Sequence, residues 1–266
     1  MLLLVGLGLG DPNGITLRGL NLAKQADIVI LDAYTSVLPE AYIKQISALL
    51  DRSITIGSRY DLEDRAADII EQARTHNVCI LVPGDPLIAT THLSLIQMAL
   101  QKGIPVDVVN GVSIHTAAIS LSGLHIYKFG PTVTIPLEAM ERKIRSPADR
   151  ILENLKRGLH TLTLLEYDAK RAEGVTVNYA ARYIHEHLPQ VYSRDQPSVA
   201  VIRAGFPDAV VVAAPIYELE KGEFPPAPHT LIVTGDLHFT EEEWLRLLQK
   251  APPYLGRASR FHRKSR

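Results

Sequence analysis

The first 125 residues alternate short apolar runs with longer amphipathic stretches, and this alternation limits the fold more than any other feature of the sequence. The apolar runs predict strands at residues 2–8, 27–32, 53–57, 78–82 and 106–110. The amphipathic stretches predict helices at residues 16–26, 39–50, 62–76, 91–103 and 113–123. Regular alternation of this kind indicates βαβ units, a largely parallel sheet and right-handed crossovers.

The pattern changes near residue 126, where a second α/β domain is expected to begin. Strands are predicted at residues 133–137, 160–166, 198–204, 209–216 and 229–235, and helices at 148–157, 176–188 and 240–250. Several of these strands follow each other on short connections, which favours a mixed sheet. For the last helix, Thr240 is the expected N-cap and Glu243 the expected partner in a capping box.

The fold class predicted from these patterns is α/β with two α/β domains, at residues 1–126 and 127–252. The N-terminal domain is expected to have a mainly parallel sheet and the C-terminal domain a mixed one. Residues 253–266 are expected to form a basic, flexible tail, because the last ten residues, "RASRFHRKSR", contain basic side chains and no acid.

Composition places the chain among globular proteins and gives no sign of a nucleic acid or a membrane as partner. Apolar residues make up 46% and charged residues 21%, with a formal net charge of −1. The single cysteine, Cys79, cannot form an internal disulfide, which fits a reducing compartment. The start, "MLLLVGLGLGDP", lacks the basic segment of a signal peptide, and no apolar run approaches the ~20 residues of a spanning helix. We expect a soluble, cytoplasmic protein.

Three loops are the first candidates for a ligand site. In open α/β sheets, ligands bind beyond the carboxyl ends of the strands. "GLGLGDPNG" follows the first predicted strand, "PGDP" (83–86) the fourth and "NGVSIHTA" the fifth. Glycines in such loops allow a ligand to approach the backbone closely.

The first loop does not match the dinucleotide fingerprint G-x-G-x-x-G. One register would need glycine at position 11, which is Asp11, and the other would need it at position 13, which is Asn13. Asp32 nevertheless lies where a ribose-binding acid could be. A glycine-rich turn without any ligand stays an alternative for this loop, and no Walker A motif occurs.

The sequence predicts no metal site and no nucleophile. His185 and His187 are two residues apart and would lie on different faces of a helix, while Cys79 lies within a predicted strand. A site built from turns with few ionisable groups suits methyl transfer from a sulfonium, because that donor is already activated and needs mainly alignment and exclusion of water.

No general base is assigned, and the catalytic residues are left unknown. Four histidines that accompany the motifs are interpreted as packed or capping residues: His92, His115, His125 and His160. An amine acceptor could lose its proton to solvent. Lys128 is kept as a candidate to meet an acid on the substrate.

Six segments in order resemble the diphthine synthase family, the diphthamide-pathway branch of the tetrapyrrole methylase-like superfamily. They are "VGLGLGD", "ILVPGDPLIATTH", "GLHIYKFG" (123–130), "GLHTLTLLE" (158–166), "VIRAG" (201–205) and "HTLIVTGDLH" (229–238). The resemblance covers about residues 1–250. "PGDP" alone indicates only the superfamily, whereas "GLHIYKFG" with "GLHTLTLLE" is more specific.

The resemblance implies S-adenosylmethionine as methyl donor and no metal. The implied acceptor is the amino group of a 3-carboxy-3-aminopropyl histidine on translation elongation factor 2, whose repeated methylation gives the trimethylammonium of diphthine. It also implies a homodimer, with the cofactor in a cleft between the two domains.

The resemblance also implies which residues contact the cofactor, many of them through backbone groups. By position in the motifs these are Leu9, Asp85, Ile88, Ser113, Ile114, Leu165, Ala204 and His229. Asp85 could instead cap a turn, Ser113 could be an N-cap, and His229 could be an ordinary histidine at the end of a strand.

The chain departs from the family in the segment 137–150, which lacks tryptophan and phenylalanine, and in carrying Glu166 where members have aspartate. Three alternatives stay open at this point. The first is a tetrapyrrole or RNA methylase of the same superfamily. The second is a dinucleotide-dependent oxidoreductase, and the third is a binding module without catalytic activity.

Overall fold

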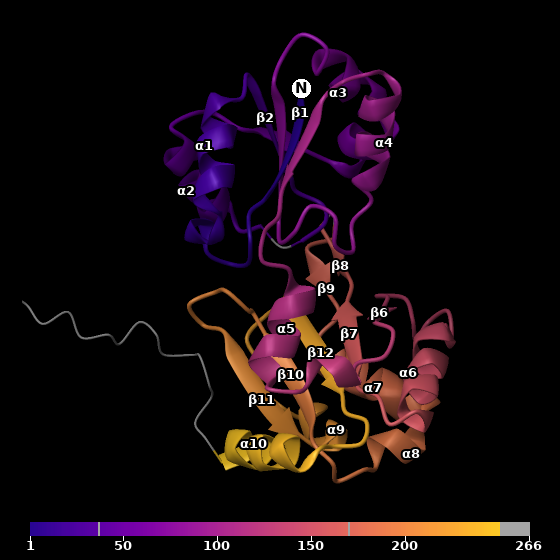
Figure 1. Cartoon of the computed structure of the whole chain (residues 1–266). Coiled ribbons are helices and arrows are strands. Elements are labelled where there is room, and N and C mark those ends of the chain that lie inside the picture. The colour runs from indigo at the N-terminus through magenta and orange to yellow at the C-terminus, as the bar shows by residue number, and fades with distance from the viewer. Residues whose placement is uncertain (37, 170, 251–266) are drawn as a thin grey trace, which may run out of the picture. The chain divides into compact units, whose positions relative to one another are not determined.

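The computed structural model describes residues 1–36, 38–169 and 171–250, and its elements are labelled in Figure 1. A five-stranded sheet with the order β3-β2-β4-β1-β5 organises the N-terminal part, and every pair of neighbouring strands is parallel. Its strands are β1 (Leu2–Gly6), β2 (Ile28–Asp32), β3 (Thr55–Gly57), β4 (Val78–Val82) and β5 (Val106–Val109). The predicted parallel sheet is confirmed.

Helices cover both faces of this sheet, with α1 and α2 on one side and α3 and α4 on the other (Figure 1). Side chains of β1 alternate between the faces: Leu3 and Val5 pack with α1 and α2, whereas Leu2 and Leu4 pack with α3 and α4. Burial on both faces explains why the strands are continuous apolar runs. The helices are α1 (Leu17–Gln25), α2 (Glu40–Leu50), α3 (Ala66–Gln72) and α4 (Leu93–Gln101).

The predicted helix at residues 62–76 is wrong in its extent. A π-helical turn, η2 (Tyr60–Asp64), precedes the shorter α3, and the Arg65 N–H donates to the Tyr60 carbonyl at 2.8 Å. Apolar spacing alone does not distinguish a wide turn from a regular one, which is why the sequence pattern missed it. The first loop also contains a 3-10 turn, η1 (Pro12–Gly14), that was not predicted.

A second five-stranded sheet, with the order β11-β10-β12-β7-β6, organises the C-terminal part. β6 and β7 are parallel, while the other neighbouring pairs are antiparallel, so the predicted mixed sheet is confirmed. The strands are β6 (Val133–Ile135), β7 (Thr161–Leu165), β10 (Ser198–Ile202), β11 (Val210–Ala214) and β12 (His229–Val233).

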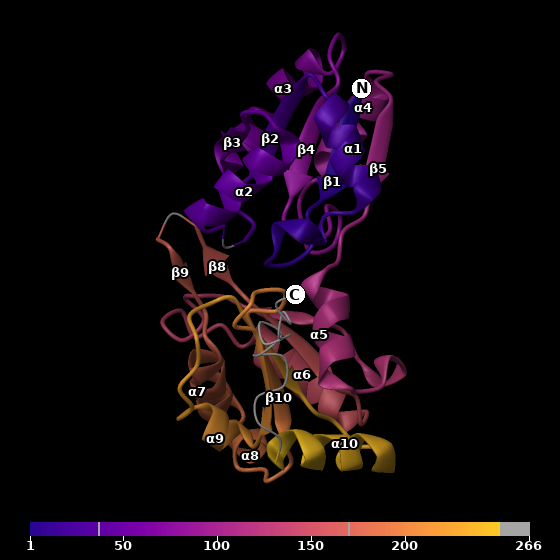
Figure 2. The same cartoon turned by 90° about the vertical axis from the view of Figure 1, so that its left-hand side faces the viewer.

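Helices flank this sheet as well, and α5 and α7 lie on opposite sides of β10 in Figure 2. α6, α7 and α9 share one apolar core with β6, β10 and β12, in which Tyr183 is fully buried. The larger helices are α5 (Ile114–Ser122), α6 (Ser146–Lys156), α7 (Val177–His187) and α10 (Phe239–Lys250). Smaller elements not predicted from the sequence are η3 (Ile126–Lys128), α8 (Pro189–Tyr192), α9 (Ile216–Leu219) and the ribbon of β8 (Tyr167–Asp168) with β9 (Glu173–Gly174).

Contacts divide the chain into two units. Among the described residues, unit 1 comprises Met1–Ile114 with the segment 168–172, and unit 2 comprises His115–Tyr167 with the segment 173–250. α5 therefore groups with unit 2, where the Trp244 indole of α10 donates to the Ser122 carbonyl at 2.9 Å. The domain limits taken from the sequence pattern, 1–126 and 127–252, stay a prediction, and the tail at 253–266 lies outside the described residues.

Candidate functional site

The loops after β4, β1 and β5 meet at three glycines of unit 1. These three strands are neighbours, and all run in the same direction. A Cβ atom on Gly6 would lie 2.4 Å from the Gly111 nitrogen, and one on Gly111 would lie 2.2 Å from the Gly84 carbonyl oxygen. Gly8 and Gly84 also exchange two backbone hydrogen bonds, at 3.1 and 2.8 Å. Only residues without a side chain allow the three backbones to come this close.

The Asp85 carboxylate ties two of these loops together. Its Oδ1 accepts from the Leu87 N–H at 2.9 Å, within its own turn. Its Oδ2 accepts from the Asn110 side-chain amide at 3.0 Å and from the Gly111 N–H at 3.3 Å. Asp85 is 6% exposed. The carboxylate thus organises the loops after β4 and β5, which includes the turn-capping role considered from the sequence.

The structure gathers the five residues predicted for this cofactor edge onto the same three strand ends. Leu9 follows β1, Asp85 and Ile88 follow β4, and Ser113 and Ile114 follow β5. Apolar side chains beside the glycine contacts are exposed, with Ile88 at 46% and Val112 at 53%. Their role as cofactor contacts stays a prediction.

A buried pair, Asp32 and His92, supports the neighbouring strand end. Asp32 ends β2, which lies beside β4, and its Oδ2 is 3.3 Å from His92 Nε2. His92 Nδ1 lies 3.2 Å from the Pro86 carbonyl oxygen, and both side chains are at most 1% exposed. The interpretation of His92 as a packed residue is confirmed, and Asp32 is too deeply buried to serve as an open ribose-binding acid.

The three residues predicted in unit 2 also share one sheet edge. β12 runs antiparallel to β7 and β10, so its first residue lies beside their last ones. His229 pairs with Ile202 of β10, which ends just before Ala204, and Thr230 pairs with Leu164, next to Leu165. Leu165, Ala204 and His229 therefore lie close together, while their cofactor contacts stay a prediction.

His229 uses both ring nitrogens within unit 2. Nδ1 accepts from the Val177 N–H at 3.1 Å, and Nε2 lies 2.7 Å from the Pro225 carbonyl oxygen, to which it donates. Burial lowers the pKa of His229, hydrogen bonds to the Pro225 and Pro226 carbonyls oppose this shift, and the charge of Arg203 adds to it. A neutral imidazole with both nitrogens engaged positions the start of α7 and the 225–228 loop and does not act as a base.

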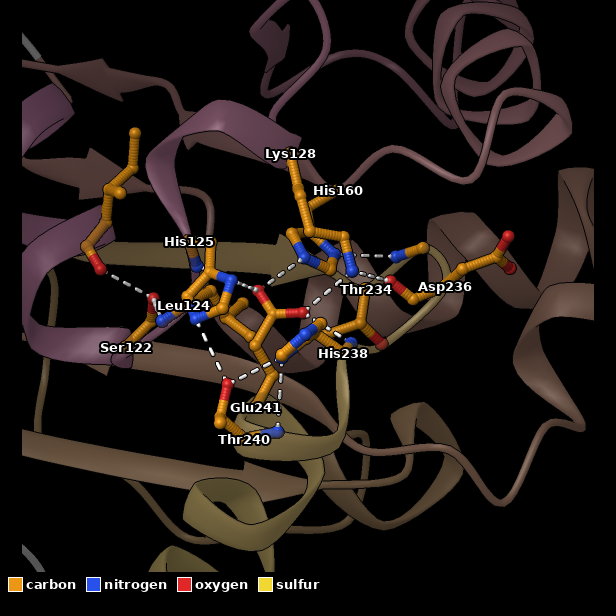
Figure 3. A network of polar contacts seen from close by, with 12 residues as sticks. Ser122, Leu124, His125, Lys128, His160, Thr234, Asp236, His238, Thr240 and Glu241 are labelled. Atoms are coloured by element: carbon orange, nitrogen blue, oxygen red, sulfur yellow. Dashed lines mark hydrogen bonds and ion pairs between the residues drawn. The ribbon is translucent and has the colours of Figure 1, made fainter.

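A second polar cluster in unit 2 surrounds the fully buried Glu241 (Figure 3). Its Oε1 accepts from the His125 N–H at 2.8 Å and from His160 Nε2 at 3.1 Å. Its Oε2 accepts from Lys128 Nζ and from the His238 N–H, both at 2.8 Å. Lys128 also donates to the Asp236 carbonyl. Both carboxylate oxygens are thus saturated by protein donors.

The charge state of this cluster follows from its hydrogen bonds. Burial alone would raise the pKa of Glu241, but the donors from His238, Lys128, His125 and His160 outweigh it and lower the pKa to about 2. Burial lowers the pKa of His160, whose Nδ1 accepts from the Gly235 N–H at 2.9 Å. His160 is therefore a neutral donor through Nε2. Lys128 is paired with Glu241, and the suggestion that it meets an acid on the substrate is not supported.

Glu241 is the residue that sequence reasoning missed. α10 begins at Phe239, so Thr240 is not its N-cap. The carboxylate that reaches back to the residue before the helix, His238, belongs to Glu241 rather than to Glu243. The sequence did contain a signal for this cluster, namely the motifs "GLHIYKFG", "GLHTLTLLE" and "HTLIVTGDLH". Each of these motifs provides a hydrogen-bond donor to the Glu241 carboxylate.

Within residues 1–36, 38–169 and 171–250, no group of three or more His, Cys, Asp or Glu side chains could hold a metal ion. Over the same described part of the chain, no helix is long and apolar enough to cross a membrane.

Comparison with known proteins places these features in a family. Residues 1–220 match the tetrapyrrole (corrin/porphyrin) methylases. The chain belongs to this family. It is 36% identical to the diphthine synthase of Haloquadratum walsbyi over 255 residues, which cover 95% of this chain and 96% of the relative. It is also 36% identical to the diphthine synthase of Methanocaldococcus jannaschii, over 93% of this chain and 98% of the relative.

A solved structure confirms the similarity in three dimensions. A crystal structure of a diphthine synthase superposes with a TM-score of 0.85 and 33% identity, covering 94% of this chain and 96% of that one. The α/β fold with a parallel and a mixed sheet is therefore that of the tetrapyrrole methylase family, as the resemblance implied.

Proposed function

We propose that the protein is a diphthine synthase, an S-adenosylmethionine-dependent methyltransferase of diphthamide biosynthesis. The proposed acceptor is the amino group of the 3-carboxy-3-aminopropyl histidine on translation elongation factor 2, with diphthine as the trimethylated product. One observation carries the proposal: similarity to diphthine synthases extends over nearly the full length of both chains. A match limited to "PGDP" would have supported only the wider superfamily.

The glycine-crowded edge of unit 1 fits a nucleoside with a thioether chain. The loops after β1, β4 and β5 present backbone groups, and Ile88 and Val112 present exposed apolar surface. Asp85 holds two of the loops in place through Asn110 and Gly111. We assign Leu9, Asp85, Ile88, Ser113 and Ile114 as cofactor contacts in unit 1.

In unit 2 we assign Leu165, Ala204 and His229 to the same cofactor. His229 acts by position, because both of its nitrogens are already bonded to backbone groups.

The bound cofactor supplies a methyl group on a positively charged sulfur. The protein's part is to align the acceptor nitrogen with that methyl group and to exclude water, since an in-line displacement needs little other assistance. A site built from backbone groups and apolar side chains is suited to this task.

The proposal also includes a homodimer in the cytoplasm. Sedimentation of the purified protein would test the homodimer, and fractionation of cells would test the compartment.

The experiment is methyl transfer from labelled S-adenosylmethionine to elongation factor 2. Two forms of the factor are compared, one unmodified and one carrying the 3-carboxy-3-aminopropyl group. The proposal predicts label only in the modified form, and mass spectrometry of its histidine peptide counts the added methyl groups. Equal label in both forms, or transfer only to a corrin precursor, would favour another branch of the superfamily.

A further inference from the structure

A second group of polar side chains lies at the ligand-binding edge of unit 1 and is not explained by cofactor binding. Tyr34 follows β2, and Thr91 lies in the loop that begins with "PGDP". Both hydroxyls donate to the same oxygen, Glu63 Oε1, at 3.1 Å from Tyr34 and 2.8 Å from Thr91. Glu63 lies in the π-helical turn η2, an element frequently found at functional sites.

The Glu63 carboxylate is held in place while part of it stays open to solvent. Its side chain is 33% exposed, and among the described residues every hydrogen bond to the carboxylate goes to Oε1. This contrasts with Glu241, whose two oxygens both accept hydrogen bonds and whose side chain is fully buried. Oε2 of Glu63 is therefore free to bind a further donor.

A cation, the Arg59 guanidinium, already lies near both this carboxylate and the Tyr34 ring. Arg59 Nε lies 3.8 Å from Glu63 Oε1, and its guanidinium carbon lies 5.4 Å from the centre of the Tyr34 ring. The Arg59 side chain is 66% exposed, so it can move away at little cost. A carboxylate beside an aromatic face is the arrangement that binds ammonium groups, quaternary ones included.

The buried pair of Asp32 and His92 fixes the positions of Tyr34 and Thr91. The Asp32 carboxylate accepts from the Tyr34 N–H at 3.0 Å and from the Thr35 N–H at 3.2 Å, which fixes the turn that carries Tyr34. On the other side, His92 follows Thr91 directly and lies 3.2 Å from the Pro86 carbonyl oxygen, so Thr91 is fixed relative to the "PGDP" loop. The carboxylate and the cofactor edge are therefore parts of one connected framework in unit 1.

Protonation states agree with this geometry. Burial is the main cause that raises the pKa of Tyr34 to about 12. The hydrogen bond with Thr91 lowers this pKa, whereas the negative charges of Asp32 and Glu63 raise it further. The phenol therefore keeps its proton and remains a donor to Glu63 at all physiological pH values.

We propose that Glu63 and Tyr34 form the site that receives the amino group of the acceptor, with Glu63 as the group that takes its proton. This inference rests on the proposed function and names the residues that act on its acceptor. The amino group enters as an ammonium in place of Arg59, and its proton passes to Glu63. The freed nitrogen lone pair forms a bond to the sulfonium methyl carbon, and the carbon–sulfur bond breaks with its electron pair left on sulfur. Glu63 then releases the proton to solvent.

The same site suits each product. Every methyl transfer moves the positive charge from sulfur to nitrogen, where the Glu63 carboxylate and the Tyr34 ring can stabilise it. A trimethylated nitrogen has no proton left to donate, but it still binds to a carboxylate and an aromatic face. Without the carboxylate, partly methylated acceptor should accumulate, because each intermediate ammonium must lose a proton before the next transfer.

The test compares Glu63→Gln with wild type in two measurements, S-adenosylhomocysteine binding by calorimetry and methyl transfer to the modified elongation factor 2. The amide keeps an oxygen for Tyr34 and Thr91 and removes the charge. We expect unchanged binding and a kcat lowered by about 100-fold, as is typical for loss of a general base. The matched control is Glu71→Gln in α3, a 63% exposed carboxylate paired with Arg74, which should behave as wild type.

Tyr34→Leu provides a second, independent variant. It removes the aromatic face and should raise the KM for the acceptor by about tenfold, in keeping with the strength of a cation–aromatic contact. The inference is overturned if wild type is active and both variants keep its kcat and acceptor KM. It is also overturned if Glu63→Gln loses S-adenosylhomocysteine binding, because the carboxylate would then act on the cofactor loops.

Failure of the proposed function gives a different result. In that case wild type itself would bind no S-adenosylhomocysteine or would transfer no methyl group to the modified factor, and this inference would fall with it.

Discussion

The Glu241 cluster in unit 2 and the strand ends of unit 1 are both rich in hydrogen bonds, yet they use them differently. Around Glu241, two backbone N–H groups, a lysine and a histidine fill both carboxylate oxygens, and the side chain is fully buried. At the edge of unit 1, Asp85 accepts hydrogen bonds from its own turn and from the loop after β5, glycine backbones crowd together, and Ile88 and Val112 stay exposed.

This difference distinguishes a structural centre, the Glu241 cluster, from the proposed binding edge of unit 1. A saturated, buried charge stabilises the fold because removing it leaves several donors without an acceptor. An edge that fixes its loops and leaves backbone and apolar surface open can bind a ligand. Changes in the Glu241 cluster should therefore affect stability, and changes at the unit 1 edge should affect cofactor binding.

The largest effect is expected for Glu241→Ala. The change leaves Lys128 as an unpaired charge and removes the acceptor of His160 and of two backbone N–H groups, so the free energy of unfolding should fall by about 3–5 kcal/mol. Trp244 is the only tryptophan and lies on the same helix, so its fluorescence during urea denaturation reports on unit 2.

Glu242→Ala is the matched control for this prediction. Glu242 is exposed and pairs with Arg246 at 3.4 Å, so its removal should change stability by less than about 0.5 kcal/mol. Equal losses for the two variants would contradict the structural role assigned to the cluster.

Because the pKa of Glu241 is lowered on folding, the stability of the protein should depend on pH in the acid range. This pKa is lowered from the ordinary 4.5 to about 2 in the folded state. The stabilisation is therefore complete above pH 4.5 and is lost as the pH falls from 4.5 towards 2. Glu241→Gln cannot titrate, so the stability difference between wild type and this variant should shrink over that interval. A difference that is constant with pH would show that the carboxylate is not held in its charged form.

At the edge of unit 1, Gly111→Ala should weaken cofactor binding. Its Cβ would lie 2.2 Å from the Gly84 carbonyl oxygen and would push the loops after β4 and β5 apart, at a cost of about 1–3 kcal/mol in stability. Calorimetry with S-adenosylhomocysteine should show a loss of affinity as well.

Gly103→Ala is the control that separates a loss of stability from a loss of affinity for S-adenosylhomocysteine. Gly103 has φ +68°, but no atom of the described residues beyond its chain neighbours lies within 4 Å of an added Cβ. It should lose about 1–2 kcal/mol of stability from backbone strain and keep its affinity for S-adenosylhomocysteine. If both glycine variants lose affinity equally, the contact between the loops is not what forms the site.

The smallest effect is expected for Asp85→Ala, which leaves the Asn110 amide and the Gly111 N–H without their acceptor. The loss of about 1–2 kcal/mol should lower S-adenosylhomocysteine affinity by roughly tenfold. Asp107→Ala, which breaks an exposed pair with Arg18, is the control and should leave affinity unchanged. An unaffected Asp85→Ala would show that this carboxylate does not shape the binding edge.

The sequence predicted much of the fold because the strands of unit 1 are buried on both faces and stand out as apolar runs. It also pointed to the loops after β1, β4 and β5, whose glycines and prolines mark unusual turns. It did not predict the π-helical turn that carries Glu63, because apolar spacing tolerates either helical form. Nor did it predict Glu241, because the donors to that carboxylate come from segments distant in sequence.

The most direct test of the account is a calorimetric titration of the wild-type protein with S-adenosylhomocysteine, beside NAD and NADP. We expect saturable binding of S-adenosylhomocysteine and no binding of either dinucleotide. No binding of S-adenosylhomocysteine, or a preference for a dinucleotide, would contradict the assignment of the glycine-crowded edge of unit 1 as a methyl-donor site.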